Sequence, residues 1–272
     1  MPSDSVILEI GGGYNPRFIK DKNPNVYHLD HDTAEALRTK YAAIPETRDN
    51  IGNIPPVIDF VFDGSPIDTL IPTSLRFDLV YGRHVLEHQV DLIGHLNSLE
   101  KIVKPSGSVI QIIPDLRATF DALRYPTVTS DALMAHGRRE GIHRGKQLFD
   151  FTSRLINKNP GHRMCDADLI DVQYAHEIRE SLAAMHAAEG TNQSYEDAHA
   201  WAFTPNSFKL LMIELRLLQL TNFSLTFLSP TYGNQFCAVM KLSDKDSSQL
   251  TSEERQSLDK ERVDLALSLR VK

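Results

Sequence analysis

Acidic residues and glycines stand where short apolar runs end, near the start of the chain. The run Leu8-Glu9-Ile10 leads into Gly11-Gly12-Gly13. Glycines after a first strand let the backbone approach a ligand closely, although a plain strand-to-turn connection has the same composition. Glu9 favours a ligand that carries positive charge. A dinucleotide fingerprint needs a third glycine where this sequence has Pro16, so pyrophosphate binding at a helix N-terminus is not indicated.

Two further acids follow apolar runs in the same way. Asp30 lies 19 residues after Gly11, close to the ~20 expected of an acid that accepts both ribose hydroxyls of a nucleoside. Asp63, followed by Gly64, could accept a hydrogen bond from the exocyclic amine of adenine, and an Asp-Gly turn is the alternative. His31 and Asp32 beside Asp30 suggest a weak metal cluster or a solvated turn, because neighbours on a strand face opposite ways.

These acids require a framework of alternating strands and helices. The apolar patterns predict strands at 6–10, 25–30, 58–63, 77–82 and 108–113, with helices at 33–41 and 92–103. Strands joined by helices favour a parallel, doubly wound sheet. The rhythm stops between 116 and 201, where we expect an inserted cap with a helix at 171–188. It resumes with a helix at 207–220, strands at 222–228 and 235–242, and a partly helical tail.

Composition limits the classes of protein and of partner. The formal net charge is −7, which argues against a nucleic-acid partner. The two cysteines, Cys165 and Cys237, form no CxxC pair, so neither a disulfide framework nor a thiolate zinc site is predicted. We see no signal peptide and no apolar stretch near the ~20 residues that span a bilayer. These features favour a soluble, cytoplasmic protein.

A longer motif carries a specific resemblance. The string FDLVYGRHVLEH at 77–88, followed by a helix and then LEKIVKPSGSVIQIIPD at 99–115, resembles the class I S-adenosylmethionine-dependent methyltransferases. Together with LEIGGG, LD and FDG in order, the resemblance covers residues 6–115, and residues 205–242 match the end of that fold. Ser106 stands where the family usually has the first glycine of its L-K-P-G-G motif.

The resemblance implies a fold and a division of the chain. The fold is α/β: a Rossmann-like, doubly wound, seven-stranded and mostly parallel sheet with an antiparallel last strand and a helical cap insertion. Residues 1–115 and 202–243 would form the cofactor-binding core, 116–201 the acceptor-binding cap, and 244–272 a C-terminal helical tail. A homodimer formed through the tail or the cap is left open.

The resemblance also implies a cofactor, S-adenosyl-L-methionine, and the residues that contact it. They run from its amino-acid end through ribose and adenine to its methyl group: Glu9, Gly11 and Gly13; Asp30; Asp63 and Gly64; then Tyr81, Gly82 and Arg83. Near this last group, His88 is expected to cap or pack the start of the following helix.

A narrower resemblance concerns the acceptor. The strings IPDLRATFDALRYPTVTSDALMAH and DAHAWAFTPNSFKLL resemble methyltransferases of bacterial glycan clusters, including polysaccharide O-methyltransferases, although Leu116 and Ala118 depart from the family's usual Lys and Tyr. The acceptor would be a hydroxyl of a sugar or glycan precursor. Its high pKa calls for a general base, for which we name Asp115 and His143. The residues expected to bind the acceptor are Arg117, His136 and Arg144.

Other interpretations remain beside this one. Another small-molecule acceptor, or a non-catalytic subunit that binds S-adenosylmethionine and regulates a partner, fits the same motifs. Tyr81-Gly82-Arg83-His84 stands where nucleic-acid amine methyltransferases carry Asn/Asp-Pro-Pro-Tyr, and Pro16 disfavours a nicotinamide oxidoreductase. A divalent ion at Asp115, His143 and Glu87 would lower the pKa of a hydroxyl, but no metal ligands are predicted.

Overall fold

The structure, a computed structural model, describes the chain except residues 1–3, 139–141, 144, 158–171, 190–196 and 271–272. Its centre is one seven-stranded sheet in the order β3-β2-β1-β4-β5-β7-β6. The first five strands pair in parallel, and β7 runs antiparallel to both of its neighbours. The strands are β1 (Ile7–Ile10), β2 (Val26–Asp30), β3 (Phe60–Val61), β4 (Phe77–Arg83), β5 (Val103–Pro114), β6 (Phe223–Leu228) and β7 (Gln235–Leu242). The predicted fold class is therefore confirmed.

The core explains why the central strands are continuously apolar. Leu8, Val80, Val109 and Met240 lie in register across four strands, and all four are fully buried. A smaller apolar cluster, which includes Ile7 and Leu79, packs on the other face. Central strands buried on both faces do not alternate between apolar and polar residues.

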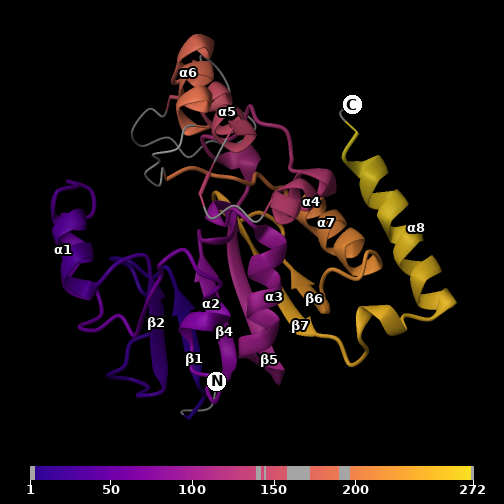
Figure 1. The fold of residues 1–272 in the computed structure, drawn as a ribbon, viewed down its shortest axis with the longest axis horizontal. Helices are drawn as coiled ribbons and strands as arrows, with labels where there is room; N and C mark the ends of the chain where they lie inside the picture. Colours follow the sequence, from indigo (N-terminus) through magenta and orange to yellow (C-terminus); the bar gives the residue numbers. More distant parts are fainter. Residues whose placement is uncertain (1–3, 139–141, 144, 158–171, 190–196, 271–272) are drawn as a thin grey trace.

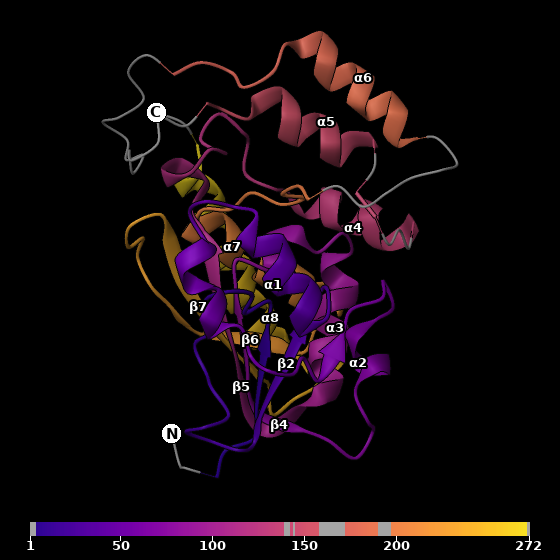
Figure 2. The same cartoon turned by 90° about the vertical axis from the view of Figure 1, so that its left-hand side faces the viewer.

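The helices flank this sheet and extend beyond one end of it. They are α1 (Ala34–Ala42), α2 (Ile67–Leu70), α3 (Leu92–Ile102), α4 (Thr129–Arg138), α5 (Gly145–Arg154), α6 (Ile178–Ala188), α7 (Pro205–Leu217) and α8 (Ser252–Ser268). Figures 1 and 2 both show α5 and α6 lying past the carboxyl ends of the parallel strands. Helix α4 lies between them and the core and packs against α3 and α7. None of the helices in the described part of the chain is long and apolar enough to cross a membrane.

The inserted segment leaves and rejoins the core at one place. Asp115 forms a parallel bridge with Phe203, and the amide of Leu116 donates to the Phe203 carbonyl at 2.8 Å. Between these points lie α4, α5 and α6. The chain then enters α7 through a capping box in which the Thr204 hydroxyl accepts from the Ser207 amide. The division of the chain into a core, a cap at 116–201 and a tail stays a prediction.

Two strands differ from the prediction. Strand β3 is an edge strand of only two residues, and the Asp59 carboxylate before it accepts from the amide of His28 at 2.8 Å. Strand β5 begins at Val103 and includes the expected turn at 105–107, because its pairing with β4 shifts register between Phe77 and Leu79. A Cβ on Gly107 would lie 2.8 Å from the Phe77 carbonyl, so this irregular pairing requires glycine.

The remaining elements lie close to their predicted ranges. Thr33 caps α1 and Asp91 caps α3, each by accepting a backbone N–H in the first turn. The helix expected at 171–188 is shorter than predicted, because α6 spans Ile178–Ala188 and Tyr174 instead forms an antiparallel bridge with Ile156. Residue 171 lies outside the described residues. Helix α8 has no buried residue and packs along α7.

Candidate active site

The glycine loop after β1 has the backbone shape that its sequence predicts. Gly11 and Gly13 have φ of +67° and +51°, which side-chain-bearing residues rarely adopt. A Cβ on Gly11 would lie 2.5 Å from Cγ2 of Val85, in the turn after β4. The loop therefore packs tightly at the junction between β1 and β4, where open α/β sheets bind their ligands.

Two buried carboxylates hold this loop in place. Oδ2 of Asp30 accepts from the Gly13 amide at 2.9 Å. The Glu9 carboxylate accepts from the amides of Arg17 at 2.7 Å and Phe18 at 2.9 Å. Burial raises the pKa of Glu9 despite these hydrogen bonds. Both acids thus support the loop through local backbone contacts, and their contact with a cofactor stays a prediction.

Asp63 and Gly64 lie in an exposed turn after β3. Oδ1 of Asp63 accepts from the Ser65 amide at 2.9 Å, and this hydrogen bond holds the pKa of Asp63 below its usual value. Gly64 has φ of +90° with open space around its Cα. The carboxylate follows β3 by two residues rather than ending it. Its proposed contact with adenine stays a prediction.

The end of β4 carries Tyr81, Gly82 and Arg83 beside a buried amide. Tyr81 packs edge-on against Phe18, with ring centroids 5.5 Å apart, and Arg83 is exposed. Gly82 pairs with Gln111 of β5, and a Cβ at Gly82 would lie 2.5 Å from Oε1 of Gln111. Gln111 is 1% exposed, and neither polar atom of its amide has a partner among the described residues.

Sequence reasoning missed Gln111. The available signal was a polar residue in the middle of an apolar strand, next to the predicted methyl-transfer position. Buried amides are nearly always hydrogen bonded, so an unpaired one beside a glycine is typical of a ligand-binding position.

Asp115 is positioned as predicted at the end of β5, but its carboxylate is already engaged. The side chain is fully buried. Oδ1 accepts from the amide and from Nε of Arg117, both at 3.0 Å. Oδ2 accepts from Nη2 of Arg117 at 2.6 Å and from the Thr231 hydroxyl. Both oxygens of this carboxylate are therefore already occupied by hydrogen-bond donors of the protein itself.

The predicted cap residues are separated rather than gathered. His143 is buried, and its Nε2 donates to the His88 carbonyl at 3.0 Å. His136 is half-buried, and its Nδ1 lies 3.0 Å from Oδ2 of Asp91, the residue that caps α3. Arg144 lies outside the described residues. Both described histidines therefore connect the insertion to the core.

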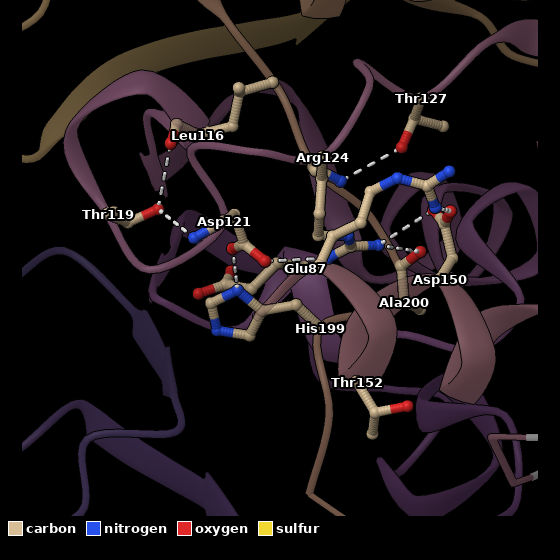
Figure 3. Close-up of polar contacts among 12 residues, drawn as sticks. Glu87, Leu116, Thr119, Asp121, Arg124, Thr127, Asp150, Thr152, His199 and Ala200 are labelled. Atoms are coloured by element: carbon tan, nitrogen blue, oxygen red, sulfur yellow. Dashed lines mark hydrogen bonds and ion pairs between the residues drawn. The ribbon is translucent and has the colours of Figure 1, made fainter. Parts of the chain in front are cut away.

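A second polar group lies where the insertion returns to the core. The Asp121 carboxylate accepts from Nδ1 of His199 at 2.5 Å and from Nη1 of Arg124 at 2.9 Å, and Asp121 and Arg124 are buried (Figure 3). Burial acts to raise the pKa of Asp121, but the contacts with His199 and Arg124 outweigh it and hold that pKa below its usual value. This arrangement leaves Nε2 of His199 as the free nitrogen of an oriented ring.

Glu87 and His88 face this histidine from the 3₁₀ turn that follows β4. Glu87 is 1% exposed, and neither carboxylate oxygen has a hydrogen-bond partner among the described residues. The His88 and His199 rings meet edge-on, with centroids 4.8 Å apart. Burial raises the pKa of Glu87. His88 was expected to cap or pack the start of the next helix, and the capping role is wrong because Asp91 caps α3.

Comparison with known proteins adds little at the level of sequence. No protein-family model and no curated protein matches this chain. Among solved structures, the mitomycin 7-O-methyltransferase MmcR is 12% identical with a TM-score of 0.40; the match covers 89% of this chain and 50% of MmcR. This chain thus spans about half the length of MmcR.

Two further structures give a similar picture. The CcbJ methyltransferase of Streptomyces caelestis is 12% identical with a TM-score of 0.42, over 88% of this chain and 89% of CcbJ. An S-adenosylmethionine-dependent methyltransferase of Clostridium acetobutylicum is 10% identical with a TM-score of 0.43, over 87% of this chain and 83% of that one. Similarities this low carry no argument about what this chain does.

Proposed function

We propose that the protein is an S-adenosylmethionine-dependent O-methyltransferase that acts on a hydroxyl of a sugar or glycan precursor. The observation that carries the proposal is the sheet order with antiparallel β7 between β5 and β6. Dinucleotide-binding sheets place a parallel sixth strand next to the fifth instead. The antiparallel strand is the feature that the resemblance to class I methyltransferases predicts.

The residues at the carboxyl ends of β1, β4 and β5 fit this cofactor. Glycine is required at positions 11 and 82, because Val85 and Gln111 occupy the space that a Cβ would need and pack the backbone tightly at this edge. The unpaired amide of Gln111 offers a donor and an acceptor at the same edge. Glu9 and Asp30 supply negative charge beside the loop. The cofactor, when bound, supplies a methyl group on a sulfonium, which is a good leaving group.

The chain's main task in such a transfer is alignment, because bringing two reactants into line supplies much of the rate. The second task is to take the proton from the acceptor hydroxyl. Asp115 and His143 are the base candidates that the sequence suggests, but both are already bonded within the fold. We therefore assign this step to the cluster of Glu87, His88 and His199, and assign Asp115 and His143 to shaping the site.

The composition of the insertion supports a polar acceptor. The described cap presents Arg117, His136 and other charged side chains near the same end of the sheet, and such groups suit a molecule with many hydroxyls. Arg117 also donates to Thr231, in the loop before β7, at 3.1 Å. Transfer to another small-molecule acceptor is the alternative outcome of the experiment below. Cytoplasmic location and a homodimer stay predictions.

Two measurements test the proposal on the full chain. Calorimetric titration should show binding of S-adenosylmethionine and of its demethylated product, and none of NAD; binding of NAD alone would overturn it. Asp30→Asn should weaken cofactor binding, whereas Asp49→Asn, on an exposed turn, should not.

The second measurement finds the acceptor. Transfer of a labelled methyl group is followed against a panel of sugars and unrelated phenols and amines. Methylation of a sugar supports the whole proposal. If only compounds of another class are methylated, the methyltransferase activity is supported and the sugar or glycan acceptor is rejected. If Asp115→Ala and His143→Ala each keep full turnover while His199→Gln loses it, the assignment of the proton-transfer step to the cluster holds.

A further inference from the structure

Three side chains that come together only in the folded protein form a metal-binding donor set. They are Glu87 and His88 from the turn after β4, and His199 from the returning end of the insertion. Each offers a ligand atom, and these atoms all lie within 4.8 Å of one another. We infer that Glu87, His88 and His199 bind one divalent transition-metal ion of the zinc type.

The unpaired carboxylate of Glu87 is the first argument. A carboxylate that is 1% exposed, with neither oxygen hydrogen bonded among the described residues, is highly unfavourable unless it is paired, neutralised or bound to a metal. Among the described residues, the one ion-pair contact recorded for Glu87 is with Nε2 of His88, at 3.8 Å from Oε1. A cation between these groups would complete the coordination that the protein leaves open.

The orientation of His199 is the second, independent argument. Nδ1 of His199 donates to Asp121 at 2.5 Å. Metal-binding histidines almost always place the other ring nitrogen on a carboxylate, a carbonyl or water, which fixes the tautomer and turns the second nitrogen to the ion. The ring of His199 thus has its proton on the side of Asp121 and presents Nε2 to the cluster. Nδ1 of His88 lies 3.0 Å from Oδ1 of Asp197 without hydrogen-bond geometry, so this contact does not by itself fix the His88 ring.

The donor types select the ion. Two imidazoles and one carboxylate are a common set for catalytic zinc and for other transition metals with open positions. Magnesium and calcium prefer sites made wholly of oxygen ligands. Zinc bonds of about 2.0–2.2 Å place tetrahedral ligand atoms roughly 3.3 Å apart, so side-chain rotations would have to bring the three ligand atoms closer from separations of up to 4.8 Å.

Three protein ligands leave at least one position open. The cluster follows β4 directly, and the Trp201 amide donates to the Glu87 carbonyl at 3.2 Å, so the ion would lie between core and insertion. Metal binding itself does not depend on the proposed function, but its role does. In methyl transfer the open position would take the acceptor hydroxyl and lower its pKa, so that its proton leaves to solvent and the three side chains serve as ligands of the ion rather than as the base itself.

Metal titration tests the site directly. The full chain is stripped with a chelator, and Zn²⁺ or Co²⁺ is added, with binding followed by calorimetry and by the visible spectrum of Co²⁺. One equivalent per chain is expected, with an intense Co²⁺ spectrum typical of low coordination number and no competition from millimolar Mg²⁺ or Ca²⁺. Glu87→Gln and His199→Gln should weaken binding at least about 100-fold, and Asp121→Asn about 10- to 100-fold. His186→Gln, on the exposed face of α6, is the matched control and should bind normally.

Several results would overturn the inference. They are the absence of stoichiometric binding, or equal affinity in Glu87→Gln, His199→Gln and the control. Should these variants fail to fold, X-ray absorption of the Zn²⁺-loaded wild-type protein decides, because two imidazole ligands are expected and none would reject the site. Cofactor binding is titrated separately: a protein that binds zinc but not S-adenosylmethionine loses the proposed function and keeps the metal site.

Discussion

The glycine loop and the cluster beneath the insertion are two polar sites assembled in opposite ways. In the loop, Asp30 binds the backbone of Gly13, 17 residues away, and Glu9 binds that of Phe18, 9 residues away. In the cluster, Asp121 binds His199 across 78 residues. The loop can form as soon as β1 and β2 pair. The cluster requires the whole insertion to fold and return, so its stability and its chemistry depend on long-range packing.

The largest expected effect comes from removing the carboxylate of Asp121, which holds His199 of the cluster in place. Asp121→Ala leaves the buried guanidinium of Arg124 without its closest partner, and losing one partner of a buried ion pair costs about 3–5 kcal/mol. Urea unfolding measures the loss. Asp131→Ala removes an ion pair with the largely exposed Lys146 and should cost about 0–1 kcal/mol. Equal effects would show that the insertion does not depend on Asp121.

Low pH is expected to affect the stability of the two regions differently, and in α3 the group responsible is a buried histidine. Burial lowers the pKa of His95, in α3 beneath the insertion, to about 4. Between pH 6.5 and 4 the unfolded chain therefore binds a proton that the folded protein does not, and stability falls by about 3 kcal/mol as pH falls. Burial also lowers the pKa of His84, directly after β4, to about 4, so both histidines contribute to the pH dependence. Unfolding followed from pH 7 to 4 should therefore show a shallower loss of stability in His95→Gln than in His186→Gln.

Glu9 in the glycine loop shifts in the opposite sense. Because burial raises its pKa, the folded state holds the proton more strongly, and the associated penalty grows as pH rises through the folded pKa. Lowering the pH thus favours the loop while it disfavours α3. Hydrogen exchange at pH 4 should therefore show earlier loss of protection in α3 than in β1, and the reverse order would contradict the assignment.

A smaller effect is expected within the loop itself. Gly11→Ala forces a side chain into φ of +67° and against Val85, which should cost about 1–3 kcal/mol and weaken cofactor binding without changing metal affinity. Thermal unfolding and the two titrations measure these separately. Gly137→Ala, in open space within α4, should instead stabilise by up to about 1 kcal/mol. A loss of metal binding in Gly11→Ala would show that the two sites are coupled.

The smallest expected effect concerns the point where the insertion rejoins the core. Thr204→Ala removes the hydroxyl that accepts from the Ser207 amide at 3.1 Å, which should cost about 1 kcal/mol. Thr33→Ala, at the exposed start of α1, removes a similar cap and should cost less. Thermal unfolding of both variants tests whether the return of the insertion also relies on a short-range interaction.

The sequence predicted the elements whose signals are local. The apolar runs of β1, β2 and β4 and the periodicity of α3 and α7 identify themselves within a few residues. The strand at 58–63 was predicted too long and the irregular start of β5 was missed, because the extent of an edge strand and a register shift depend on the partner strand. The antiparallel β7 came from the family resemblance and is confirmed by its pairing.

The same distinction between local and long-range signals applies to the residues of the candidate site. Glycine and acid spacing predicted the loop that Gly11, Gly13 and Asp30 form. Asp121 and Arg124 were missed because charged residues in a polar insertion usually lie in solvent, and only their burial distinguishes them. Their opposite charges, three residues apart, were the available signal. The sequence could not predict that the ring of His199 is held in one orientation, because the residue that binds it, Asp121, lies 78 residues away.

The bridge between Asp115 and Phe203 has a consequence for how this protein could diversify. An insertion whose two ends meet at one hydrogen-bonded pair can lengthen, shorten or be exchanged between relatives while the strand order stays intact. Its interior and the glycine loop can therefore diverge at different rates. The exceptions are the residues that contact the core directly, namely His136, His143 and the stretch from His199 to Trp201. A chimaera that preserves those residues is the one expected to retain both halves of the molecule.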